Sequence, residues 1–142
     1  MKPTVPVPET HRDLLARPIP VVLATMGPGG FPRARPAWCE FDGSRVAILA
    51  AHGSAEARDV ADRPVATLLA VDPDDTSRWI EVRGDAEVTA EGATELADRL
   101  TRLCTPHDPD HGGPIFAHQE DRSAPAVLRI RPTRVNLDAI HR

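Results

Sequence analysis

The pattern of apolar and polar residues predicts six β-strands along the chain. Residues 79–88 give the clearest case, because apolar and polar side chains alternate there as in a strand with one face in a core. Residues 65–71 (VATLLAV) are apolar on both faces and predict a central, buried strand. The remaining predicted strands cover residues 19–25, 32–41, 45–51 and 126–137.

Apolar residues at helical spacing predict two helices. Ser54 is a suitable N-cap for a two-turn helix that ends at Pro64, and residues 91–104 predict a longer helix. The stripes expected to face the core are Ala57, Val60 and Ala61 in the first helix, and Ala93, Leu96, Ala97, Leu100 and Leu103 in the second. The proline-rich start predicts an extended arm over residues 1–13, with room for a short helix at 10–16.

The order of these elements favours a mainly β fold with short helices. Strands follow one another through short turns, without βαβ alternation, which predicts a six-stranded antiparallel barrel in a single domain over residues 1–142. Pro32 and Pro36 cannot donate to a ladder, so their strand should lie at an edge or be interrupted. Residues 105–125 predict an irregular loop. Side chains fill so small a barrel, so a ligand should bind outside it or between subunits.

Composition narrows the classes of partner. The net charge of −4 argues against a general nucleic-acid binder. No stretch has the length of a membrane span or the apolar core of a signal peptide, so a cytoplasmic protein is expected. Lys2 is the only lysine among 17 basic residues, and the planar fork of arginine suits phosphate or carboxylate recognition.

Three residues suggest an anion site near the first helix. The guanidinium groups of Arg35 and Arg58, the Ser54 hydroxyl and the first helical amides could converge on a phosphate. The alternative is a capping serine with two solvated arginines. Spacing alone favours this alternative.

Four other polar and aromatic residues each have two possible roles, one in cofactor binding and one that is only structural. Trp38 and Trp79 either flank a planar ring or pack in the core or an interface. Arg83 either reaches a cofactor tail or pairs with a carboxylate on its own strand, such as Glu81 or Asp85. His52 either donates a hydrogen bond to a cofactor, which makes it the only catalytic candidate, or is a loop residue without a role.

The residues with metal-ligating chemistry gather in the predicted irregular loop. They are His107, His111 and His118, with Asp108 and Asp110. A transition-metal site holds its ligands in fixed geometry, which such a loop does not provide, so no metal is expected.

The chain resembles the flavin-binding split barrels of the pyridoxamine 5′-phosphate oxidase-like superfamily over roughly residues 14–137. The resemblance is carried by LATMGPGGFPRARPAW, FDGSRVAILAAHGSAEARDVADRPVATLLAVDPDD, RWIEVRGDAEVT and LRIRPTRV. The Pro-x-x-x-Pro-x-Trp run and the Trp-Ile-Glu-Val-Arg-Gly strand are similar to the branch that uses the deazaflavin coenzyme F-420.

This resemblance implies a homodimer whose two cofactor sites lie between the subunits. It implies hydride transfer to or from a small organic substrate by F-420, with flavin mononucleotide (FMN) or no cofactor as alternatives. Arg35 matches the phosphate-holding arginine of the second strand, and Arg58 remains from the basic group at the helix start. The cofactor contacts expected are Arg35, Pro36, Trp38, His52, Ser54, Arg58, Trp79 and Arg83.

The chain departs from the family pattern at three positions. Ala55 and Glu56 stand where relatives commonly have basic residues, and Glu40 stands where flavin-binding relatives place a lysine. A carboxylate near a phosphate repels it, so tight binding of FMN is less expected. The alternatives are a non-catalytic flavin- or haem-binding module, and a split-barrel protein that has lost its flavin site and serves another reaction.

Overall fold

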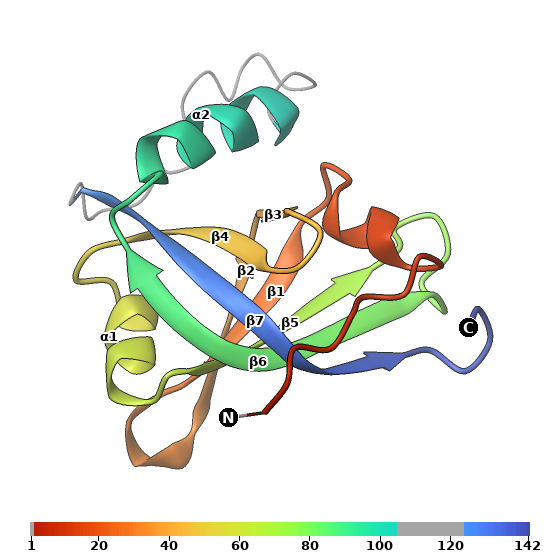
Figure 1. Cartoon of the computed structure of the whole chain (residues 1–142), viewed down its shortest axis with the longest axis horizontal. Coiled ribbons are helices and arrows are strands. Elements are labelled where there is room, and N and C mark those ends of the chain that lie inside the picture. Colours follow the sequence, from red (N-terminus) through yellow and green to blue (C-terminus); the bar gives the residue numbers. More distant parts are fainter. Residues whose placement is uncertain (1, 105–123) are drawn as a thin grey trace.

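The computed structural model describes residues 2–104 and 124–142, which form one curled antiparallel sheet with two α-helices (Figure 1). The strand order is β2-β1-β5-β6-β7-β4-β3. The strands are β1 (Val21–Met26), β2 (Pro32–Ala37), β3 (Cys39–Phe41), β4 (Val46–Ala51), β5 (Val65–Val71), β6 (Trp79–Thr89) and β7 (Pro125–Leu137). The helices are α1 (Ala55–Asp62) and α2 (Ala93–Cys104), with 3-10 turns η1 (Arg12–Leu15) and η2 (Pro28–Gly30).

The described part of the chain has seven strands rather than the six predicted, because the segment 32–41 is interrupted at Trp38. Its first half, β2, pairs with β1, whereas its second half, β3, pairs with β4. These two strands lie at opposite ends of the strand order, so the step through Trp38 links the two edges of the curled sheet. β2 pairs only with β1, which confirms the edge position that Pro32 and Pro36 predicted.

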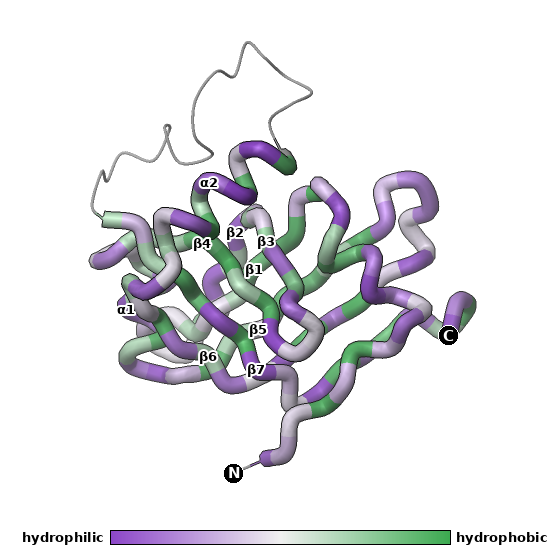
Figure 2. Tube along the Cα trace, turned by 45° about the horizontal axis from the view of Figure 1, so that its top comes forward, coloured by the Kyte–Doolittle hydropathy of each residue, from purple (hydrophilic) through white to green (hydrophobic). Residues whose placement is uncertain are grey.

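The main core fills the concave face of the sheet. Leu14 and Leu15 of η1 are fully buried there. Their neighbours from the strands include Leu23, Ile48, Leu68, Ile80, Val82, Leu128 and Ile130. In Figure 2, hydrophobic and hydrophilic positions alternate along β6. That alternation is the physical basis of the strand prediction for residues 79–88.

A smaller apolar cluster lies beneath α2, on the other face of β4 and β7. Leu96 and Leu100 pack there against Val127, and Trp38 is packed against this cluster. Leu103, expected in the same stripe, is 41% exposed, so the core-facing stripe is shorter than the pattern predicted. Among the described residues, no helix is both long and apolar enough to cross a bilayer.

Two burial predictions were wrong in part. β5 is central, but only Ala66, Leu68 and Ala70 are buried, while Val65 is 44% exposed on the opposite face. In α1, Val60 is buried but Ala61 is exposed. The buried neighbour of Val60 is instead Asp59, whose partners are described below.

Residues 2–8 of the N-terminal arm have no regular secondary structure, and the arm is attached to the sheet. The Val5 amide donates to the Pro132 carbonyl at 2.8 Å, and Val7 is buried in the core. The predicted helix at 10–16 is the 3-10 turn η1. Most of the predicted irregular loop, with its histidines, lies outside the described residues, and β7 begins within its last residues, at Pro125.

Candidate anion and cofactor site

The first helix begins as the sequence predicted. Ser54 has extended backbone angles, and its hydroxyl oxygen accepts the Ala57 amide at 3.3 Å. The turn before it passes through Gly53, whose φ of 77° lies in the left-handed region that favours glycine. The start of α1 is therefore fixed by its own cap and turn, close to the edge strand β2.

The arginine predicted to hold a phosphate already has a carboxylate partner. Arg35 Nε lies 3.0 Å from Glu56 Oε1 in the first turn of α1. The Arg35 side chain is 51% exposed, whereas that of Glu56 is 15% exposed. The structure thus brings Arg35 to the helix start, as predicted, and places the acidic departure from the family pattern directly on it.

A second arginine of β2, which sequence reasoning missed, attaches α1 to the sheet. Arg33 Nε donates to Asp59 Oδ2 at 2.9 Å, and the Thr25 hydroxyl donates to the same oxygen at 2.8 Å. Burial would raise the pKa of Asp59, but the hydrogen bonds from Arg33 and Thr25 hold it below its ordinary value. Arg33 and Arg35 are two residues apart on one strand, and this spacing was the signal that both face α1.

Two more predicted residues lie at the start of α1. Arg58 is exposed, and the described part of the chain offers its guanidinium no hydrogen bond or ion pair. His52 is exposed in the turn, where its amide donates to the Ala124 carbonyl at 3.1 Å. The guanidinium of Arg58 is therefore available to an anion near the helix N-terminus.

Glu40, the other acidic departure, has a separate partner. Arg99 of α2 makes two hydrogen bonds to it, from Nε at 2.8 Å and from Nη2 at 2.9 Å. This forked pair joins β3 to α2 and neutralises the carboxylate. Of the two acidic departures, Glu56 is the one that contacts Arg35.

Trp79 and Arg83 lie on the opposite face of the sheet from Arg35. Register alignment places Arg35 opposite Leu23, Leu23 opposite Leu68 and Leu68 opposite Val82, so these four share the inner face. Arg83 follows Val82 and therefore points outward, where its Nε donates to Glu81 at 2.8 Å. This is the plain alternative foreseen for Arg83. A single chain does not bring all the predicted site residues together.

The two tryptophans are also separated. Trp38 is half-buried against the cluster beneath α2. Trp79 is half-buried at the start of β6, opposite Val71, and its amide donates to Asp138 at 3.2 Å. Pro36 is exposed on β2, opposite Val22. Within residues 2–104 and 124–142, no three His, Cys, Asp or Glu side chains are grouped as metal ligands would be.

The curled antiparallel sheet with two helices is typical of the split-barrel fold. The chain belongs to the pyridoxamine 5′-phosphate oxidase family, whose model it matches over residues 7–137. The search of functionally curated proteins gave no match.

Solved structures agree with this assignment. An F420 reductase is 26% identical, with a TM-score of 0.74, and the match covers 92% of this chain and 98% of the other. HupZ of Group A Streptococcus is 17% identical with a TM-score of 0.66, covering 94% and 95%. A putative pyridoxamine 5′-phosphate oxidase from Listeria innocua is 19% identical with a TM-score of 0.57, covering 83% and 86%. The last two show the fold alone.

Proposed function

We propose that the protein is an oxidoreductase that binds the deazaflavin F-420 and transfers a hydride to or from a small organic substrate. The observation that carries the proposal is the convergence of Arg35 with the capped start of α1. Family membership and the 26% identity to an F420 reductase across 92% of the chain support it. FMN is the alternative cofactor. Glu56 beside Arg35 repels the phosphate of either cofactor, and it disfavours FMN more because a phosphate monoester carries more negative charge than a diester.

The cofactor, when bound, supplies the hydride chemistry, and the chain supplies position and charge. We assign the phosphate contact to Arg35 and Arg58 with the α1 amides, since guanidinium forks and helix N-termini both suit anions. His52, in the turn before the Ser54 cap, is the candidate proton donor. Pro36 is aligned with the outer-face residue Val22, and Trp38 packs beneath α2, so these two expected contacts do not lie beside Arg35 in the same chain.

We propose further that the site is completed by a second copy of the chain. Trp79 and Arg83 face away from Arg35, so they would serve a cofactor that is held mainly by the other subunit. The same outer face carries Val22, 40% exposed, and Val65, 44% exposed. Exposed apolar side chains on neighbouring strands are a surface that dimerisation would bury.

A visible spectrum and a titration test the cofactor assignment. Addition of F-420 to the purified protein should give saturable binding in the micromolar range, and FMN should bind more weakly. Reduced F-420 with a test enone should then be consumed by the protein. Saturable binding without consumption would favour the second candidate, a non-catalytic flavin- or haem-binding module. Absence of binding below the millimolar range would overturn the proposal and favour a protein that has lost its flavin site.

Replacement of Arg35 by alanine should weaken F-420 binding about tenfold, because it removes a charge-assisted contact to phosphate. The side chain is half exposed, so the fold should tolerate its loss. Fluorescence titration gives the dissociation constant. Arg63→Ala, an exposed arginine directly after the C-terminal end of α1, is the control and should bind as the unmodified protein does. An unchanged constant for Arg35→Ala would remove this residue from the site.

Replacement of Glu56 by glutamine should have the opposite effect, about a tenfold gain in affinity for F-420. The variant removes the carboxylate that neutralises Arg35 and repels phosphate. Glu56→Lys should gain more. Asp62→Asn, an exposed acid at the end of the same helix, tests whether net charge alone explains the gain. Equal gains in Asp62→Asn and Glu56→Gln would contradict a specific role for Glu56.

A further inference from the structure

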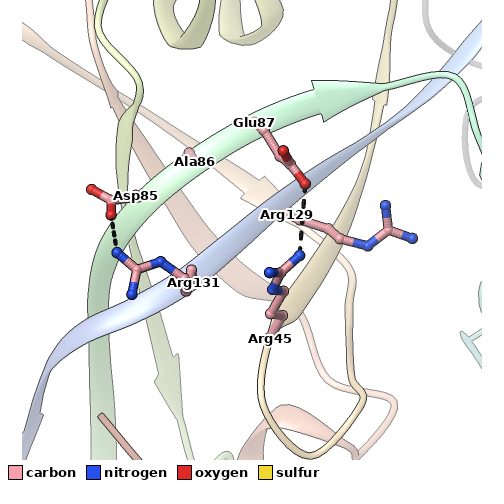
Figure 3. Close-up of a pocket in the computed structure, with 6 residues that line it drawn as sticks. All are labelled: Arg45, Asp85, Ala86, Glu87, Arg129 and Arg131. Atoms are coloured by element: carbon pink, nitrogen blue, oxygen red, sulfur yellow. Dashed lines mark hydrogen bonds and ion pairs between the residues drawn. The ribbon is translucent and has the colours of Figure 1, made fainter. Parts of the chain in front are cut away.

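A pocket lies on the outer face of the sheet, where β4, β6 and β7 run side by side (Figure 3). Its volume is about 160 Å³. The lining residues are Arg45, Asp85, Ala86, Glu87, Arg129 and Arg131. Asp85 and Glu87 alternate with buried positions of β6, so this pocket and Arg35 lie on opposite faces of the sheet.

The charges in this pocket are paired except for one arginine. Arg131 contacts Asp85, and it also donates to the Lys2 carbonyl at 2.8 Å and to the Thr4 hydroxyl at 3.0 Å. Arg45 Nη1 lies 3.8 Å from Glu87 Oε1. Both carboxylates therefore have a cationic partner, and Arg131 is held in place by the N-terminal arm.

Arg129 is the arginine of this pocket that has no carboxylate partner among the described residues. It stands opposite Glu87 in the β6–β7 register, but Figure 3 shows its guanidinium extending away from the Glu87–Arg45 pair. The described residues provide it with neither a hydrogen bond nor an ion pair. A Cβ added at Gly92 would lie 3.8 Å from Arg129 Nη2, so the guanidinium lies beside the start of α2. Its position is defined, and its donors remain available.

We propose that this pocket binds a small monocarboxylate through Arg129. The pocket carries three guanidinium groups against two carboxylates, a surplus of one positive charge. A carboxylate neutralises that surplus charge and accepts two parallel hydrogen bonds from the Arg129 guanidinium. A phosphate dianion would bring a second negative charge near Asp85 and Glu87, which repel it. The volume equals that of about five water molecules, which suits a short or compact acid.

Amide chemical shifts during titration with sodium benzoate test the proposal. Benzoate should shift the amides of Ala86, Gly92 and their neighbours with one saturable, millimolar dissociation constant. Inorganic phosphate at about pH 8 should bind at least tenfold more weakly. Arg129→Gln should weaken benzoate binding about tenfold, and Arg134→Gln, on the same strand, should leave it unchanged. Glu87→Gln removes a repelling charge and should tighten benzoate binding about threefold.

Three other outcomes of this titration would overturn the proposal. Equal binding of benzoate and phosphate, or equal losses in Arg129→Gln and Arg134→Gln, would show nonspecific charge attraction and overturn the proposal. Absence of saturable shifts would overturn it as well. The Glu87→Gln variant guards against an unfolded Arg129→Gln protein, since its expected effect is a gain. None of these measurements uses a flavin or deazaflavin, so the outcome is independent of the proposed oxidoreductase function.

Discussion

Replacement of Gly84 by alanine is expected to cost about 3 kcal/mol of folding free energy, more than alanine at any other glycine that the structure describes. Gly84 is buried in β6, at the irregularity where the register with β7 shifts. A Cβ at this position would lie 1.9 Å from the Arg131 carbonyl oxygen and 2.7 Å from its carbonyl carbon. Both obstacles are backbone atoms of a paired strand, so the two long strands would have to separate.

Chemical denaturation with urea measures the effect, and Gly30→Ala is the matched control. Gly30 has a φ of 81°, but no atom lies within 4 Å of an added Cβ. Its replacement should therefore cost only the backbone strain of the left-handed region, about 1 kcal/mol. A smaller loss in Gly84→Ala than in Gly30→Ala would contradict the close approach of β6 and β7.

Local sequence patterns predicted the strands and helix ends that neighbouring residues in the sequence determine. The alternation over residues 79–88 produces β6, and a hydroxyl before an apolar stripe produces the Ser54 cap of α1. The prolines at 32 and 36 predicted an edge strand, because proline has no backbone N–H to donate to a neighbouring strand. The antiparallel arrangement followed from strands joined by short turns, but local patterns did not specify the strand order of the sheet.

The features that sequence reasoning missed depend on contacts between distant segments. The division of residues 32–41 into two strands follows from pairing with β1 on one side and β4 on the other. Asp59 interrupts the apolar stripe of α1 because Arg33 and Thr25, from two other elements, satisfy its carboxylate. A stripe of apolar spacing contains no information about such partners.

For the candidate site, the sequence suggested the residues but not how they pair. Arg35 was expected near the helix start, and Glu56 was identified as a departure from the family pattern. The ion pair between them was not predictable, because it depends on the approach of α1 to the edge of the sheet. The pocket at Arg129 was not predictable for the same reason. It depends on the alignment of Glu87 with Arg129, and α2 separates these two residues in the sequence.

Replacement of Asp138 by asparagine is expected to lower the thermal midpoint by about 10 °C, because it disrupts a buried junction between the chain ends. Asp138 is 3% exposed, and its Oδ1 lies 2.7 Å from Nε2 of the fully buried His11. Oδ2 accepts the amides of Ile140 at 3.1 Å and His141 at 2.7 Å. Both oxygens face donors, so an asparagine amino group would oppose donors in either orientation.

The same junction predicts that the stability of the fold depends on pH. Burial raises the pKa of Asp138, but the hydrogen bonds from His11 and His141 hold it well below its ordinary value. As the pH falls below about 4, the unfolded chain takes up a proton at this position while the folded protein does not. Stability from Asp138 is therefore present above that pH and is lost on acidification, so the free energy of unfolding should fall with decreasing pH.

Urea denaturation between about pH 2.5 and pH 6 checks this sign. The unmodified protein should lose stability steeply at the acid end, and Asp138→Asn, already destabilised, should lose less, because it lacks the titrating group. Asp74→Asn is the control, since that side chain is 82% exposed and pairs only at the surface with Arg17. It should follow the unmodified protein closely. Parallel acid profiles for Asp138→Asn and the unmodified protein would show that Asp138 does not control the acid sensitivity of the fold.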